Sequence, residues 1–294
     1  MRARMALLLA ALLLVPSAAG AVTPGRPPGL SVRISPTAPR QGDMVFVLVT
    51  GAQGARDVEG SLDGRSLAFF PYGENWAALI GVDLDARPGK VPWRVGVIGG
   101  TGVASTRAGS VAIRARTFPV QHLTLPNEMV ELDAESERRA AAEAARLRTL
   151  YDTRSPDRFW QGRFTRPVRA EGPGSGFGSR RVINGKPRSP HGGTDWSAER
   201  GTPVVAANRG RVALVGDFFF GGNLVALDHG LGLYTLYMHL DRVDVREGAV
   251  VERGEPLGTV GSTGRATGPH LHFQVQAGRS RVDPATLFAL PVGD

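Results

Sequence analysis

The stretch PHLHF at residues 269–273 decides how the C-terminal half of this chain is interpreted. Successive side chains of a β-strand point to opposite faces, so His270 and His272 share one face. Leu271 and Phe273 then point into a core. The pattern therefore predicts a half-buried strand from which two imidazoles project side by side. A solvent-facing strand that happens to carry two histidines is the alternative.

The segments around this strand have the same alternating character and are separated by glycine-rich turns. They are TPVVAANRGRVALVG (202–216), GNLVALDHG (222–230), LYTLYMHL (233–240) and AVVERGEPLGTVG (249–261). Closely spaced strands of this kind predict an antiparallel β domain over residues 160–290.

The N-terminal half is also expected to be β. LSVRI (30–34) alternates, MVFVLV (44–49) is a short buried run, and turn residues recur at short intervals. These features predict a β-sandwich-like accessory domain at 30–117. Residues 118–159 read as a linker with one helix at 133–151, which Asp133 can cap and which no Gly or Pro interrupts. The predicted fold class is therefore mainly β.

The first residues resemble a targeting segment rather than part of the fold. Arg2 and Arg4 precede the apolar run MALLLAALLLVP, and small residues follow up to Ala21. This predicts a secretory signal peptide at 1–21, with an uncleaved anchor as the alternative. No later segment is apolar enough to span a membrane. The sequence has no cysteine, which excludes disulfides, thiolate ligands and an acylated lipoprotein cysteine.

The formal net charge is +8, and residues 154–188 are especially rich in Lys and Arg. For an exported protein, anionic envelope polymers are a more plausible partner than nucleic acid. A solvated basic loop without a partner is the alternative. The glycines at 172–178 do not indicate phosphate binding, because the Lys-Ser/Thr and strand–helix frame of a P-loop are missing.

Two further segments carry residue types that bind zinc or move protons. In HGGTD (191–195), two glycines allow a tight loop that can aim His191 and Asp195 at one point. In LYTLYMHL, strand alternation predicts that Tyr237 and His239 share a face. His229, in a predicted turn after Asp228, is interpreted as structural, and His122 in the linker has no partner nearby.

In combination these segments resemble the lysostaphin/LytM-type family of zinc metallopeptidases that cut peptidoglycan peptides. The resemblance is carried by HGGTD, GTPVVAANRGRV (201–212), LDHGLGLYTLYMHL (227–240) and GSTGRATGPHLHFQV (261–275), followed by VDP (282–284). It covers about residues 160–290. It says little about residues 30–155, which we interpret as a spacer or wall-binding module with a connecting helix.

The resemblance implies a role for each matching position. His191, Asp195 and His272 would bind Zn²⁺, and His270 and His239 would act on the attacking water. Two imidazoles and one carboxylate leave an open position on the metal, as catalytic zinc requires. Loops 172–188 and 262–269 would flank the substrate groove, and Arg265 and Thr267 would border it.

The resulting hypothesis is an exported zinc metalloendopeptidase that hydrolyses stem or cross-link peptides of peptidoglycan, in the periplasm or at the cell surface. No nucleic acid partner and no stable membrane span after signal removal are expected. Two alternatives stay open. One is a non-hydrolytic wall-binding or amidase-activating scaffold, and the other is an exported protease that acts on glycine-rich proteins.

Overall fold

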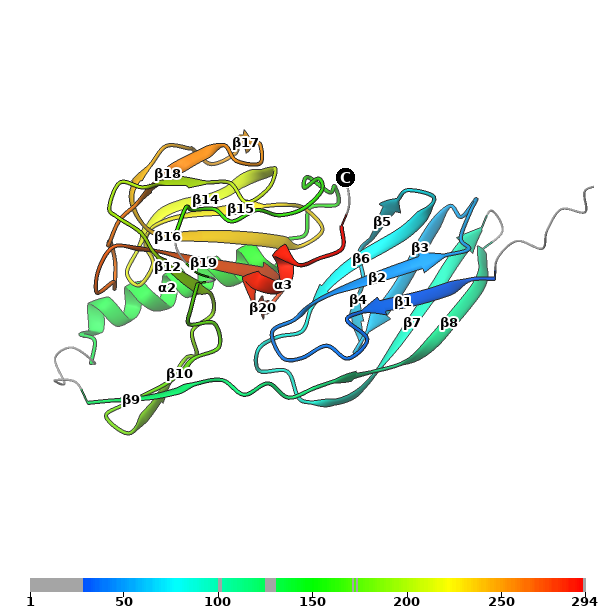
Figure 1. Cartoon of the computed structure of the whole chain (residues 1–294), viewed down its shortest axis with the longest axis horizontal. Coiled ribbons are helices and arrows are strands. Elements are labelled where there is room, and N and C mark those ends of the chain that lie inside the picture. Colours follow the sequence, from blue (N-terminus) through cyan, green and yellow to red (C-terminus); the bar gives the residue numbers. More distant parts are fainter. Residues whose placement is uncertain (1–28, 100–101, 125–130, 171, 173, 293–294) are drawn as a thin grey trace, which may run out of the picture.

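The structure is a computed structural model that describes residues 29–99, 102–124, 131–170, 172 and 174–292, and the predicted signal peptide at 1–21 lies outside them. The described chain is mainly β, which confirms the predicted fold class. Its strands form four sheets, and the largest of these lies in the C-terminal half (Figure 1).

Two four-stranded sheets make up the N-terminal part. The first contains β1 (Ser31–Ser35), β2 (Met44–Thr50), β6 (Asn75–Gly81) and β5 (Phe69–Tyr72), in that order. The second contains β4 (Arg65–Ser66), β3 (Asp57–Leu62), β7 (Gly89–Gly99) and β8 (Gly102–Ile113). Val45 and Val47 of β2 pack against Leu62 and Val111 between the two sheets, in the manner of a β-sandwich.

The connecting region contains a strand and a long helix. Strand β9 (Val120–Leu123) pairs in parallel with β10 (Arg180–Ile183), and β10 pairs with β11 (Lys186–Arg188). Helix α2 spans Ala134–Asp152, and the Asp133 carboxylate caps its first turn. Part of loop 172–188 is a hairpin, and β9 supplies it with a pairing partner from a distant part of the sequence.

The C-terminal part is built on a nine-stranded sheet with the path β12-β19-β16-β15-β14-β17. These strands are β12 (Thr194–Ser197), β19 (His270–Ala277), β16 (Leu233–Val243), β15 (Gly222–Asp228), β14 (Gly210–Phe218) and β17 (Val250–Val251). Strands β13 (Pro203–Val205), β18 (Pro256–Val260) and β20 (Ser280–Val282) extend it, and the short helix α3 (Pro284–Phe288) follows. The described pairs within this sheet are antiparallel.

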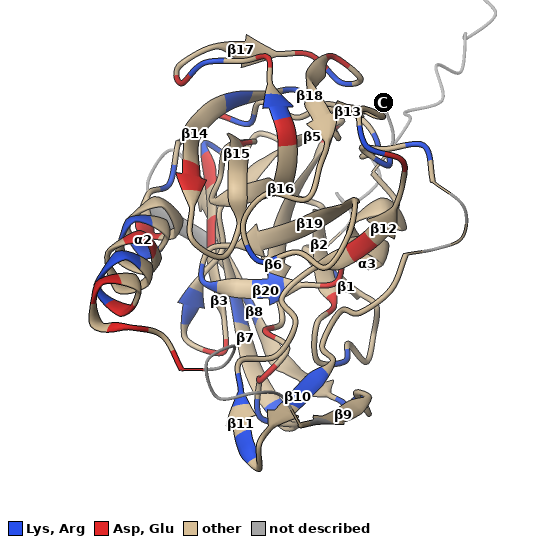
Figure 2. Ribbon diagram, turned by 90° about the vertical axis from the view of Figure 1, so that its left-hand side faces the viewer, with Lys and Arg blue, Asp and Glu red and all other residues tan. Residues whose placement is uncertain are grey.

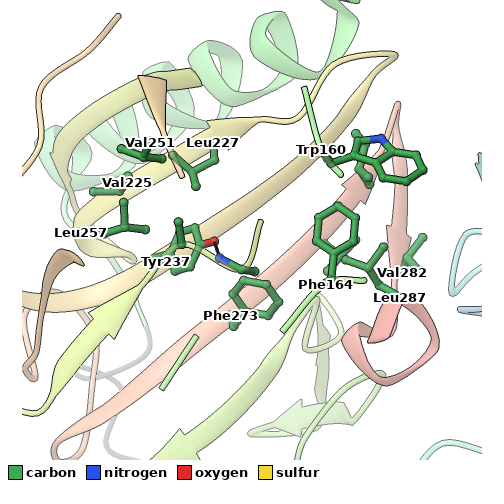
Figure 3. Close-up of a cluster of buried hydrophobic side chains, with 14 of the residues drawn as sticks. Trp160, Phe164, Val225, Leu227, Tyr237, Val251, Leu257, Phe273, Val282 and Leu287 are labelled. Atoms are coloured by element: carbon green, nitrogen blue, oxygen red, sulfur yellow. Dashed lines mark hydrogen bonds between the residues drawn. The ribbon is translucent and has the colours of Figure 1, made fainter. Parts of the chain in front are cut away.

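One continuous apolar core joins the two parts. Figure 3 shows part of this core in the C-terminal half. In the C-terminal part Tyr237 packs on Phe273, and its hydroxyl accepts a 2.8 Å hydrogen bond from the Ala207 amide. From the N-terminal part Phe70 meets Trp160 edge-on, with ring centroids 5.3 Å apart. The interface between the two parts is therefore a close-packed apolar core rather than a hydrated polar contact.

Strand β2 explains how this joined core arises. Val45, Val47 and Val49 lie within the N-terminal sandwich, whereas Met44 and Phe46 belong to the core shared with the C-terminal part. Successive side chains of a strand face opposite ways, so β2 is covered on both faces. This is why MVFVLV reads as an uninterrupted apolar run.

Polar contacts reinforce the same interface. The Arg281 guanidinium binds the Asp83 carboxylate at 2.7 Å, and Arg116 binds Asp283 at 2.8 Å. The backbone amide of Met44 donates to the Thr286 hydroxyl at 2.9 Å. Among the described helices, none has both the length and the apolar character needed to cross a membrane.

Candidate metal centre

Three neighbouring strands carry the site: β12, β19 and β16. Strands β12 and β19 are antiparallel, and their register sets Asp195 opposite His272 and Ser197 opposite His270. Directly opposed residues share a face. The carboxylate of Asp195 and the imidazoles of His270 and His272 therefore project from the same side of the sheet, in agreement with the alternation of PHLHF.

His191 lies just before β12, and the glycine-rich loop 172–178 holds its backbone. The amide of His191 donates to the Ser179 carbonyl at 3.0 Å, and the amide of Gly178 donates to the His191 carbonyl at 2.8 Å. His191 is thus held by one hydrogen bond at its amide and one at its carbonyl, and these two bonds fix the direction of its side chain. The loop that lacked a phosphate-binding signature thus supports a candidate ligand.

Gly176 allows the close approach that this support requires. Its φ is +98°, and a β-carbon there would lie 2.8 Å from Nδ1 of His191. A side chain would be strained by the backbone and would also displace the imidazole. Farther along the loop, Ser175 and Asp195 exchange two backbone hydrogen bonds of 3.1 and 2.8 Å.

The side-chain atoms of the three predicted ligands converge. Nε2 of His191 lies 3.2 Å from Oδ1 of Asp195, and Nδ1 of His272 lies 2.8 Å from the same oxygen. All three ligand atoms lie within 4.8 Å of one another. Ligands at about 2.1 Å from a tetrahedral zinc are themselves roughly 3.4 Å apart. The spacing and the two-nitrogen, one-oxygen donor set therefore fit a metal such as zinc.

The charges of this set also fit metal binding. Burial would raise the pKa of Asp195, but hydrogen bonds from His191 and His272 outweigh burial and hold it well below its usual range. Burial lowers the pKa of His272 and outweighs the opposing hydrogen bond to Asp195. Asp195 is thus ionised and His272 neutral, which are the forms that ligate metals.

His270 and His239 are oriented by carbonyl groups. Nδ1–H of His239 donates to the Thr263 carbonyl at 2.8 Å, and Nδ1–H of His270 donates to the Gly268 carbonyl at 2.8 Å. A carbonyl can only accept, so Nε2 of each neutral ring is left as a proton acceptor. Nε2 of His270 lies 3.9 Å from Oδ1 of Asp195, which places this acceptor beside the ligand set.

His239 reaches the site in a way that strand alternation did not predict. Its ring centroid lies 4.7 Å from that of His270, whereas Tyr237 is opposite Phe273 in the core. The two residues therefore face opposite ways, and the expectation of a shared face was wrong. The reason is the φ of +62° at His239, which breaks the alternation, and a 2.7 Å hydrogen bond from its amide to Gly221 fixes the turn.

The electrostatic environment of His239 keeps its imidazole neutral. Burial lowers its pKa to about 4, and the neighbouring histidines His270 and His272 add to this effect. At neutral pH the ring is a base rather than a cation. The neutral acceptor His239 thus lies next to three convergent ligand atoms, with the ring of His270 beside it.

The remaining histidines lie elsewhere. His229 is fully buried, with hydrogen bonds of 2.8 Å to the Arg209 carbonyl and to the Thr235 hydroxyl, so its role in this structure is one of packing. His122 is exposed in β9, opposite Val182.

Asp228, which precedes the predicted turn, is the last residue of β15. Its buried carboxylate accepts from the Ser155 hydroxyl and from the Gly230 amide. It therefore fastens the linker that follows α2 to the large sheet.

Comparison with known proteins points to one family. The sequence profile described as "Peptidase family M23" matches residues 189–284, which include His191, Asp195, His239, His270 and His272. The crystal structure of a candidate peptidase M23 from Pseudomonas aeruginosa is 31% identical, with a TM-score of 0.65. The match covers 85% of this chain and 95% of that one.

Curated relatives match over about a third of this chain. Peptidoglycan DD-endopeptidase ShyB from Vibrio cholerae is 40% identical over 94 residues, which is 32% of this chain and 22% of ShyB. DD-carboxypeptidase/endopeptidase Mpg from Neisseria meningitidis is 44% identical over 101 residues, which is 34% of this chain and 23% of Mpg. The matched region thus spans less than a quarter of each of these relatives.

Proposed function

The chain belongs to peptidase family M23, and from this premise we propose that it is a zinc-dependent endopeptidase of bacterial peptidoglycan. The observation that carries the proposal is the convergence of three ligand atoms with two oriented imidazoles on one sheet face. The names of the relatives ShyB and Mpg, which describe endopeptidases, support the type of reaction and the substrate.

The proposed roles follow from the geometry. His191, Asp195 and His272 would hold the zinc, which would polarise the scissile carbonyl and acidify the attacking water. The Nε2 atoms of His270 and His239 are free to accept the proton of this water. Once protonated, the same imidazoles can stabilise the developing oxyanion and return the proton to the leaving amine. The carbonyls that receive Nδ1–H keep both rings in the required tautomer.

The proposal includes export. The segment at 1–21 has the charged start, apolar run and small-residue site of a secretory signal. Peptidoglycan lies outside the cytoplasm, so an enzyme that hydrolyses it has to be exported. We place the protein in the periplasm or at the cell surface.

A retained catalytic set argues against the scaffold alternative. A non-hydrolytic relative of this family can lose ligands without losing its binding role, but this chain keeps His191, Asp195 and His272 within 4.8 Å of one another. The imidazoles of His239 and His270 are present as well, beside these ligand atoms.

The test is digestion of purified cell walls by the zinc-loaded full chain, followed by mass spectrometry of the soluble fragments. We expect peptide-bond cleavage that stops with EDTA and returns with added zinc. Glycine-rich peptides, offered in parallel, distinguish a protease for glycine-rich proteins. The absence of EDTA-sensitive fragments from every wall preparation would rule out the proposed function.

A further inference from the structure

We propose that Arg181, Arg188 and Arg265 form a subsite that binds a free carboxylate of the peptide substrate beside the metal centre. This inference rests on the proposed function and adds a recognition element to it. The three guanidiniums come from the two loops that were expected to flank the groove, at 172–188 and 262–269.

The backbone ties all three residues to the candidate metal centre. Arg188 precedes His191 by three positions, and it is the direct cross-strand partner of Arg181 in the β10–β11 hairpin. Arg265 follows Thr263 by two positions, and the Thr263 carbonyl is the group that orients His239. The subsite therefore connects the segment before a metal ligand with the segment that holds a catalytic imidazole.

Arg181 and Arg188 are opposite each other in the hairpin, and Arg265 is affected by the charges of both. Burial and the charges of Arg181 and Arg188 lower the pKa of Arg265, so the guanidiniums of the two loops are within electrostatic range. The Arg265 guanidinium lies over the Phe220 ring at 4.3 Å, and its amide donates to the Phe220 carbonyl. These two contacts restrain Arg265 in the absence of any anionic partner.

These guanidiniums also lack counter-ions. Within the described part of the chain, none of the three forms an ion pair or a side-chain hydrogen bond, and Nε of Arg181 is buried without a partner. Their neighbours on the hairpin differ, because Arg180 binds Asp85 at 2.6 Å and Lys186 lies 3.9 Å from Glu131. Figure 2 shows the basic residues of β10 and β11.

Unpaired like charges repel one another, and a buried unpaired donor is unfavourable. A bound anion removes both penalties. The planar forks of arginine match a carboxylate in a bidentate geometry.

The peptide substrate is the anion that the position favours. A peptide in the groove would bring its own carboxylates within reach of residues adjoining His191 and His239. An extended polyanionic polymer would instead need a long basic track. Here the other basic residues of the hairpin strands, Arg180 and Lys186, are already paired with Asp85 and Glu131.

The test is calorimetric titration of the zinc-loaded full chain with two wall stem peptides that differ only in free or amidated carboxylates. We expect the free carboxylate to bind about 10- to 100-fold more tightly, as for a charge-assisted hydrogen bond. Arg265→Gln and Arg188→Gln should each reduce this preference severalfold while leaving the affinity for the amidated peptide unchanged. Lys186→Gln is the matched control on the same hairpin, and it should keep the full preference.

Two results would overturn the subsite. One is equal binding, or no binding, of the two peptides by the unmodified chain. The other is a preference that survives in both arginine variants when their zinc content and melting temperature are normal. Arginine-dependent binding of soluble polyphosphate without a carboxylate preference would overturn it in favour of an envelope polymer. Wall digestion tests the proposed function separately, because a carboxylate preference can be measured whether or not hydrolysis occurs.

Discussion

Asp195 is the residue on which the contacts of the metal centre converge. Its Oδ1 lies within 4 Å of ring nitrogens of His191, His270 and His272. Hydrogen bonds from His191 and His272 outweigh burial and lower the pKa of Asp195, so its charge is retained at any ordinary pH. The site therefore combines one fixed negative charge with imidazole nitrogens, which are donors that suit a divalent cation.

Replacing single histidines should separate metal binding from turnover. His191→Ala or Asp195→Ala removes a ligand, so we expect loss of zinc and activity together. His270→Ala should keep most of its zinc and lose about 10²- to 10⁴-fold in kcat, because only a proton acceptor is removed. Elemental analysis and kinetics on the same preparations check this. Loss of metal in His270→Ala, with retention in His272→Ala, would reverse the two assignments.

His229 should make the stability of the fold depend on pH. Burial lowers its pKa to about 4 from an ordinary 6.5, so folding favours the neutral ring. The contribution of the neutral ring to the free energy of unfolding is complete above pH 6.5. It is lost as the pH falls from 6.5 towards 4. The loss amounts to about 3 kcal/mol.

Chemical denaturation between pH 7 and pH 4 measures this effect. His229→Gln, which has no titrating ring, should show a flatter pH dependence than the unmodified chain. His122→Gln, at an exposed position in β9, should follow the unmodified chain. Identical slopes for the unmodified chain and His229→Gln would contradict the prediction.

Much of the site could be inferred from local sequence, and the part that could not depends on contacts between distant segments. The alternation in PHLHF was enough to predict that His270 and His272 share one face, and the register with Asp195 agrees with this. The orientation of His239 was missed because it depends on a left-handed φ and on a hydrogen bond to Gly221. Neither feature has a periodic signal.

Among the elements, the glycine-rich loop and the β9–β10–β11 sheet were the least predictable. Strand β9 lies in the expected linker. It is part of a sheet because it pairs with β10, a strand that follows α2 in the sequence. The glycines at 172–178 gave no sign of a function, yet the backbone of Ser175 and Gly178 binds both ends of the HGGTD segment. Composition reveals flexibility in a free chain, but it does not reveal which segment a loop will pack against.

Two glycines of this loop offer a matched test of that support. Gly176→Ala would bring a β-carbon to 2.8 Å from Nδ1 of His191, whereas a β-carbon at Gly172 meets nothing within 4 Å. Both residues have positive φ, so both variants should lose about 1 kcal/mol of stability from backbone strain. Only Gly176→Ala should also weaken zinc affinity, by about 10- to 100-fold. Competition with a zinc chelator measures this, and equal affinities in the two variants would refute the supporting role.

On the scale of the whole molecule, the two β-rich parts share one core. The mainly β class was predictable from alternation and turn spacing. The shared core was not predictable, because the run MVFVLV does not indicate which segment packs against each face of the strand. The apolar residues Met44, Phe46 and Phe70 belong to the same cluster as Trp160 and Phe164.

The shared core predicts that the molecule unfolds as one cooperative unit. Phe70→Ala should lower the stability of the whole chain by about 3 to 5 kcal/mol, because it opens a cavity against Trp160. Val120→Ala, at an exposed side chain, should have little effect. Differential scanning calorimetry should give a single transition that moves to lower temperature in Phe70→Ala. Two transitions, of which only one moves, would show that the parts unfold separately.

The two covered faces of β2 have a consequence for the ancestry of this protein. An enzyme that gains a domain by simple fusion can later exchange it, because the two domains then meet only at their surfaces, and an unrelated domain can take the same place. Here a recombined partner would have to reproduce the shapes of Met44, Phe46 and Phe70 as well as an acid opposite Arg281. The two halves are therefore expected to be inherited together, with substitutions on one side of the seam matched by substitutions on the other.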